Sequence, residues 1–176
     1  MSASYALLGI LGQQPTYGYD LKRDYDFLYG KDKPLAFGQV YATLSRLLRD
    51  KKIATKTIEK SYGPERKLYA ITRFGRKDLE TWLSTPEKLH PNTQTVLFIK
   101  VVTSILLDKK PNLYLDAQRS AHIARMRELT EVRRNSDLAH SLQADYALFH
   151  LEADLRWIDL TEARLQTLKQ EILSER

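Results

Sequence analysis

The sequence predicts a mainly α-helical protein of the α+β class, with helices and a two-stranded hairpin in its N-terminal half and helices alone in its C-terminal half. All seven glycines lie at or before Gly75 and all six prolines at or before Pro111, so residues 112–176 contain neither helix breaker. In the segment KLYAIT, residues 67–72, successive side chains alternate as they do in a half-buried strand. Together these two patterns confine the strands to the first half of the chain.

Three helices are predicted before the strands. Ser2 or Ser4 can cap a first helix, and a second helix covers residues 17–29. A third helix follows Pro34. Its apolar residues have the spacing i, i+4, i+7, i+8 of one helix face, and they are Val40, Leu44, Leu47 and Leu48.

Two strands and a fourth helix follow the third helix. The segments ATKTIEK, residues 54–60, and RKLYAIT, residues 66–72, are the predicted strands, and the Gly-Pro pair in the SYGPE connection favours a tight turn between them. Thr72 is then expected to cap a helix that extends to about Ser84. The residues expected to close the domain are Phe74, Leu79, Trp82 and Leu83.

A domain boundary is predicted at the segment TPEKLHPNTQT, because the residue before each of its prolines is disfavoured in a helix. We therefore assign residues 1–86 to one domain, residues 87–94 to a linker and residues 95–176 to a helical domain. The helices expected in the last domain cover about residues 95–107, 112–134 and 138–173.

The last predicted helix indicates a partner chain. A helix of about 35 residues is about 50 Å long, and its apolar face is expected to be too long for one small chain to cover. The apolar spacing along it is close to that of a coiled coil. The predicted dimerisation residues are Leu151, Leu155, Ile158, Leu165 and Ile172. We therefore expect a homodimer.

Positive charge is concentrated in the first half of the chain. Residues 1–86 contain 15 Lys and Arg against 9 Asp and Glu, whereas residues 87–176 contain 13 of each. Between Arg49 and Lys77 there are ten basic residues and three acidic ones. So basic a segment is suited to bind a polyanion, and double-stranded DNA is the expected partner. The alternative is an edge hairpin that its charges keep soluble.

Three segments of the first half carry motifs: ALLGILGQQPTYGYDLKRDYD, GQVYATLSRLLRDKKI and GPERKLYAITRFGRKDLETWL, in this order. They resemble the signature blocks of the PadR family of bacterial transcriptional regulators. The resemblance implies a winged helix-turn-helix domain that binds DNA and a helical dimerisation domain, here of the larger Vir type. We interpret the protein as a homodimeric repressor of an inverted-repeat operator. The alternative is a winged-helix module that binds protein and makes no sequence-specific contact with DNA.

The charge pattern and the resemblance together select eight DNA-binding candidates. Gln39 lies near the start of the third helix, where a recognition helix meets base edges, and glutamine can pair with adenine. The resemblance favours a phosphate contact for Tyr41, and Lys22 is expected to contact only the DNA backbone. The full set is Lys22, Gln39, Tyr41, Ser45, Arg46, Lys60, Arg66 and Lys67.

The chain departs from the family pattern in two places. Asp-Lys-Lys-Ile, residues 50–53, stands where an acidic residue and a glycine usually precede the first strand. Gly-Pro-Glu-Arg, residues 63–66, stands where Gly-Arg-Pro-Arg is common. The second departure makes the wing less basic.

No residue pattern indicates catalysis, a cofactor or a metal site. The chain has no cysteine, its four histidines lack a ligand spacing with carboxylates, and no glycine-rich phosphate loop occurs. Without a signal peptide pattern or an apolar segment of about 18 residues, we expect a cytoplasmic protein. A small aromatic effector remains an open alternative to ordinary core packing for five aromatic residues, namely Phe98, Tyr114, Tyr146, Phe149 and Trp157.

Overall fold

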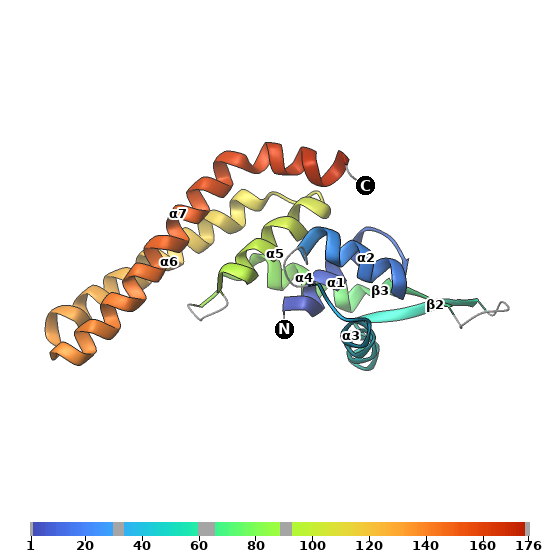
Figure 1. Ribbon diagram of the computed structural model, residues 1–176, viewed down its shortest axis with the longest axis horizontal. Helices are drawn as coiled ribbons and strands as arrows, with labels where there is room; N and C mark the ends of the chain where they lie inside the picture. Colours follow the sequence, from blue (N-terminus) through green and yellow to red (C-terminus); the bar gives the residue numbers. More distant parts are fainter. Residues whose placement is uncertain (1, 30–33, 60–65, 89–92, 175–176) are drawn as a thin grey trace. The chain divides into compact units, whose positions relative to one another are not determined.

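The computed structural model describes residues 2–29, 34–59, 66–88 and 93–174 (Figure 1). The chain divides into two compact units. Unit 1 comprises residues 1–83 and 98–109, and unit 2 comprises residues 84–97 and 110–176. All described strands lie in unit 1, as the distribution of glycine and proline predicts.

Unit 1 is built on three helices, α1 (Ser2–Gln13), α2 (Gly18–Tyr29) and α3 (Phe37–Arg49). The predicted stripe on α3 is confirmed, because Val40, Leu44 and Leu47 are buried and Leu48 is half-buried. Burial of each such side chain is worth about 1.5–3 kcal/mol. The stripe therefore fixes which face of α3 lies on the outside.

The sheet of unit 1 contains β1 (Thr16–Tyr17), β2 (Ile53–Glu59) and β3 (Arg66–Ile71), antiparallel and in the order β1-β3-β2. β2 and β3 form the predicted hairpin, which projects from the helices in Figure 1. Its connection, residues 60–65, lies outside the described residues. The sequence did not predict β1, since two residues are too short to show a periodic pattern.

The turn from α3 to β2 contains a residue in the left-handed region, Lys51, with φ of 55°. The Lys52 N–H donates to the Leu47 carbonyl and the Lys51 N–H to the Leu48 carbonyl, both at 2.9 Å. This pair of hydrogen bonds ends many helices and usually has glycine at the left-handed position. The departure in residues 50–53 thus leaves a lysine where the backbone favours glycine.

Helix α4 (Arg73–Ser84) begins at the predicted cap. The Gly75 N–H donates to the Thr72 hydroxyl oxygen at 3.0 Å, which provides a partner for a backbone group that the helix start leaves unpaired. Of the residues expected to close the domain, Leu79 and Leu83 are buried and Trp82 is half-buried. The prediction is wrong for Phe74, which is 59% exposed.

Helix α5 (Thr93–Leu106) lies against α1 through two glycines. A Cβ atom at Gly9 would lie 2.6 Å from the Thr103 Cγ2 atom, and one at Gly12 would lie 2.7 Å from the Leu107 Cδ2 atom. Most apolar side chains of α5 are buried, namely Leu97, Ile99, Val101, Val102, Ile105 and Leu106, whereas Phe98 is 38% exposed. Residues 98–109 accordingly group with unit 1, whereas the sequence analysis assigns all of 95–176 to one helical domain.

Unit 2 is dominated by α6 (Pro111–Asn135) and α7 (Leu138–Ser174), two of the helices predicted from the sequence. Figure 1 shows them side by side, and the short connection between them makes the pair antiparallel. Their shared core consists of Leu129, Ala144, Leu148 and Leu151. Near the start of α6, the Asn112 amide lies 3.4 Å from the Glu162 carboxylate.

A buried polar network lies inside unit 2. The Gln118 amide group donates to the Glu87 carbonyl at 2.8 Å and accepts from the Glu87 N–H at 2.6 Å. Because this pairing fixes the orientation of the amide, Gln118 Nε2 is the donor toward His122 Nδ1, 3.3 Å away. The imidazole proton is then on Nε2, which lies 3.3 Å from the Asp154 carboxylate. Burial lowers the pKa of His122, against the opposing effect of the Asp154 carboxylate, and so disfavours the protonated form of this histidine.

Candidate nucleic-acid interface

The outer face of α3 carries four of the predicted candidates, Gln39, Tyr41, Ser45 and Arg46, and all four are exposed. The buried stripe holds the other side of the helix in the core of unit 1. The helix can therefore present these four side chains to a partner without any change in the fold.

Gln39 has a structural role that the sequence did not suggest. Its side-chain carbonyl oxygen accepts a hydrogen bond from the Ala36 N–H at 3.0 Å, and so pairs one of the backbone groups at the start of α3. A bidentate contact with adenine uses both the amide oxygen and the amide nitrogen. Such a contact would compete with this cap, and base recognition by Gln39 remains a prediction.

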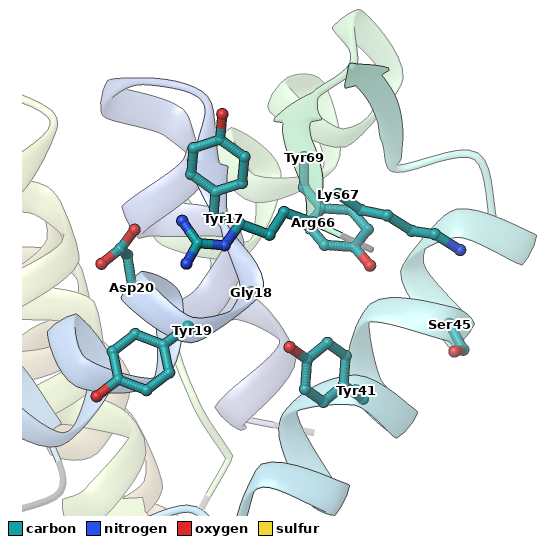
Figure 2. Close-up of a pocket in the computed structure, with 9 residues that line it drawn as sticks. All are labelled: Tyr17, Gly18, Tyr19, Asp20, Tyr41, Ser45, Arg66, Lys67 and Tyr69. Atoms are coloured by element: carbon teal, nitrogen blue, oxygen red, sulfur yellow. The ribbon is translucent and has the colours of Figure 1, made fainter. Parts of the chain in front are cut away.

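The wing contributes Arg66 and Lys67 at the start of β3, and both are exposed. Neighbouring residues of a strand face opposite ways. In Figure 2 the Lys67 side chain extends toward the side of α3 that carries Ser45, whereas Arg66 extends toward Tyr17 and Asp20. Lys60, the third wing candidate, lies outside the described residues.

A pocket of about 640 Å³ lies between the start of α2, the outer face of α3 and the wing strand β3. Four predicted candidates meet there: Tyr41, Ser45, Arg66 and Lys67. The remaining lining residues are Tyr17, Gly18, Tyr19, Asp20 and Tyr69 (Figure 2). We call this hollow the wing pocket.

Four of the five additional lining residues were missed for one reason. They belong to the segment TYGYD, whose place beside the wing depends on the unpredicted strand β1. Thr16 lies opposite Tyr69 and Tyr17 opposite Leu68 in the sheet. The sequence shows here a glycine between two tyrosines at the start of the predicted helix 17–29, within the first of the three motif segments.

The wing pocket has the chemistry of a DNA backbone contact. Tyrosine and serine hydroxyls, a guanidinium and an ammonium group are the donors that proteins use to bind phosphate oxygens. Its one acidic residue, Asp20, forms an ion pair with Arg23 at 3.1 Å, which partly neutralises the carboxylate. The lining therefore favours an anionic partner.

Two basic residues near the interface are paired within the chain. Lys22 forms an ion pair with Asp26, and its Nζ atom lies 5.2 Å from the centroid of the Phe37 ring. Lys52 lies 2.7 Å from the Asp78 carboxylate, and this hydrogen bond raises the pKa of Lys52. Part of the positive charge counted from the sequence is thus neutralised locally. A backbone contact by Lys22 remains a prediction.

Four of the five predicted dimerisation residues are buried within a single chain. Leu151 and Ile158 are 0% exposed and Leu165 and Ile172 are 8% exposed within a single chain, and Leu155 is half-buried. For Leu151 the cover is α6, which packs against the first part of α7. One chain therefore does cover much of this face. A role of these residues in dimerisation remains a prediction.

A different face of α7 carries exposed apolar side chains. Leu138 is 76% exposed, Leu142 59%, Tyr146 69%, Phe149 67% and Leu160 49%. Residues at these spacings lie on one side of a helix. We call this set the outer stripe of α7.

The predicted aromatic set does not form a group on one surface. Tyr114 is buried and donates to Gln118 at 3.0 Å, whereas Tyr146 and Phe149 belong to the outer stripe. Among the described residues, no cluster of three or more His, Asp or Glu is placed to hold a metal ion. Within the same ranges, no helix has both the length and the apolar content that a membrane crossing requires.

Three core helices, a basic hairpin and an outward-facing third helix define unit 1 as a winged helix-turn-helix domain. Residues 7–81 match the transcriptional regulator PadR-like family. The members of this family are described as transcriptional regulators and not as enzymes.

Two curated relatives share this region. The probable transcriptional regulator Rv1176c of Mycobacterium tuberculosis is 30% identical over 86 residues, which is 49% of this chain and 46% of the relative. The negative transcriptional regulator PadR of Bacillus subtilis is 29% identical over 79 residues, which is 45% of this chain and 43% of the relative. The matched region is thus slightly less than half of each relative.

One solved structure with a similar arrangement is Bacillus subtilis PadR in complex with operator DNA. Its identity to this chain is 20%, with a TM-score of 0.45. The match covers 92% of this chain and 98% of that one.

Proposed function

We propose that this chain is a transcriptional regulator that binds double-stranded DNA as a homodimer and represses transcription from an inverted-repeat operator. The observation that carries the proposal is the wing pocket, where Tyr41 and Ser45 of the recognition helix meet Arg66 and Lys67 of the wing. Hydroxyl and cationic groups on two elements that flank one hollow can hold a DNA backbone while α3 lies in the major groove.

The charge distribution supports DNA as the partner. The excess of Lys and Arg over Asp and Glu lies within residues 1–86, and these residues include the whole winged domain. The helical half carries no net charge. A module that binds protein alone would have no need for this concentration of charge beside its recognition helix.

Dimerisation is supported by the outer stripe of α7, because large apolar side chains gathered on one helix face usually mark an interaction surface. A symmetric dimer would use the same stripe from each chain. It would present two recognition helices to half-sites about 34–36 Å apart, one turn of the DNA helix. Repression is proposed because the Bacillus subtilis relative is named a negative transcriptional regulator.

Selection from a random DNA pool tests the proposal. The full chain is incubated with random duplexes, bound DNA is recovered and amplified over several rounds, and the enriched sequences are compared. We expect an inverted repeat with half-sites separated by one or two helical turns. A folded protein that enriches no sequence would favour the protein-binding alternative.

A further inference from the structure

Gly18, the first residue of α2, lies directly beside the ring of Tyr41 on the recognition helix. A Cβ atom at position 18 would lie 2.9 Å from the Tyr41 Cε1 atom, 3.1 Å from its hydroxyl oxygen and 3.2 Å from its Cζ atom. The first distance is shorter than real Cβ contacts, and the other two are tighter than most of them. Tyr41 can keep its position only because residue 18 has no side chain.

The backbone does not require glycine at this position. None of the described glycines has a positive φ, so residue 18 adopts a conformation open to other amino acids. The space that glycine leaves for the Tyr41 ring is therefore the physical reason the structure gives for this residue.

The contact places the Tyr41 hydroxyl at the wing pocket. In Figure 2 the ring points from α3 toward Gly18, with its hydroxyl at the pocket. Tyr41 is 46% exposed, so a partner can reach it. A tyrosine hydroxyl in this position can donate a hydrogen bond to a phosphate oxygen.

We propose that Gly18 is a positioning residue for DNA binding: it lets Tyr41 lie against the start of α2, so that the Tyr41 hydroxyl donates to a backbone phosphate. The inference rests on the proposed function. Gly18 acts indirectly, through the position of Tyr41. The contact made by the Tyr41 hydroxyl is uncharged, unlike the contacts made by the cationic side chains of the wing.

A double-mutant cycle tests the inference on the full chain. The four proteins are the wild type, Gly18→Ala, Tyr41→Phe and the double variant, each titrated with the selected operator and with random duplex DNA. Loss of a hydrogen bond to a charged group should weaken affinity about tenfold for each protomer in Tyr41→Phe, and so about a hundredfold for the dimer. Gly18→Ala should show a similar loss because the added methyl displaces the ring. The double variant should be no weaker than Tyr41→Phe alone.

Salt dependence provides a second readout. A neutral hydroxyl releases no counterion, so Gly18→Ala and Tyr41→Phe should keep the wild-type slope of log affinity against log salt. Lys67→Ala should lower the magnitude of that slope by about 0.9 for each protomer. Both tyrosine-contact variants should lose affinity equally for operator and random DNA, since phosphate contacts carry no base information.

The matched control is Gly38→Ala at the start of α3, where an added Cβ meets nothing within 4 Å. It shows the effect of a glycine replacement on stability without displacement of Tyr41, and its melting temperature should not fall below that of the wild type. Thermal melting of each variant checks folding, and the exposed Tyr41 ring should let Gly18→Ala remain folded.

Two results would overturn the inference while leaving the proposed function intact. One is wild-type affinity in Tyr41→Phe, a variant that removes a single exposed hydroxyl and whose folding is not in question. The other is a double variant whose loss is the product of the two single losses, which would mean that Gly18 acts independently of Tyr41. If the wild type itself binds no DNA, the proposed function fails and the positioning role fails with it.

Discussion

Leu151 and Phe149 lie two residues apart on α7 and face opposite ways: Leu151 is 0% exposed, whereas Phe149 is 67% exposed. α7 therefore has two apolar faces. One face packs within the chain, in part against α6, and the other lies on the surface of unit 2. Sequence periodicity identified the first face and assigned it to a second chain.

Substitutions at these two positions should have different effects. Phe149→Glu should leave the chain folded but weaken self-association, because it places a charge in the outer stripe. Leu151→Ala should destabilise the fold by about 2–5 kcal/mol, since it leaves a cavity in a packed core. Light scattering measures the first effect and urea denaturation the second. A stable dimer of Phe149→Glu would contradict the proposal that the outer stripe of α7 is the dimer interface.

Lys51→Gly should stabilise the chain by about 0.5–1 kcal/mol. The left-handed region costs a residue with a Cβ about 1–2 kcal/mol, and part of the gain is offset by the greater freedom of glycine in the unfolded chain. Lys51→Ala is the matched control, because it removes the same charge but keeps the Cβ atom. Urea denaturation should rank the glycine variant above both other proteins, and equal stability of the two variants would refute the argument.

Gln39→Ala should separate base recognition from capping. If Gln39 contacts a base, affinity for the operator should fall by about 1–3 kcal/mol and selectivity should relax at one position of each half-site. Lys67→Ala should instead weaken operator and random DNA alike. A Gln39→Ala variant that melts earlier but keeps full selectivity would restrict this residue to the cap seen in the structure.

The buried His122 gives a pH dependence with a definite sign. Its pKa is lowered in the folded chain, chiefly by burial, while the unfolded chain has a pKa of about 6.5. As pH falls below about 6.5, the unfolded state takes up a proton that the folded state resists, so stability should fall. His122→Gln cannot titrate at this position, and its stability relative to the wild type should rise between pH 7.5 and pH 5.5. If the difference in stability between His122→Gln and the wild type stays constant over this pH range, the lowered pKa of His122 is contradicted.

The sequence predicted the helices, the hairpin and the helix cap at Thr72, because these depend on local periodicity and on residues such as glycine and proline. It did not predict β1, whose two residues pair with β3 only in the folded chain. The grouping of residues 98–109 with unit 1 was also missed, since it depends on a close helix contact at Gly9 and Gly12.

The candidate site was predicted in part. Tyr41, Ser45, Arg66 and Lys67 were selected from charge, helix position and family resemblance, and the structure brings them to one pocket. Gly18 has no charge or donor to attract notice, and its relation to Tyr41 exists only in three dimensions. Likewise, periodicity could not tell which apolar face of α7 would be covered by α6.

The salt dependence of operator binding is the most direct measure of DNA binding by unit 1. If each protomer neutralises about four phosphates, the slope of log affinity against log salt for the dimer should be roughly −7, from about −0.9 per phosphate. The titration is made with the full chain and the selected operator, between low and physiological salt. A steep linear decrease is the result we predict. Affinity that does not change with salt, or no binding at any salt concentration, would contradict the assignment of unit 1 as a DNA-binding domain.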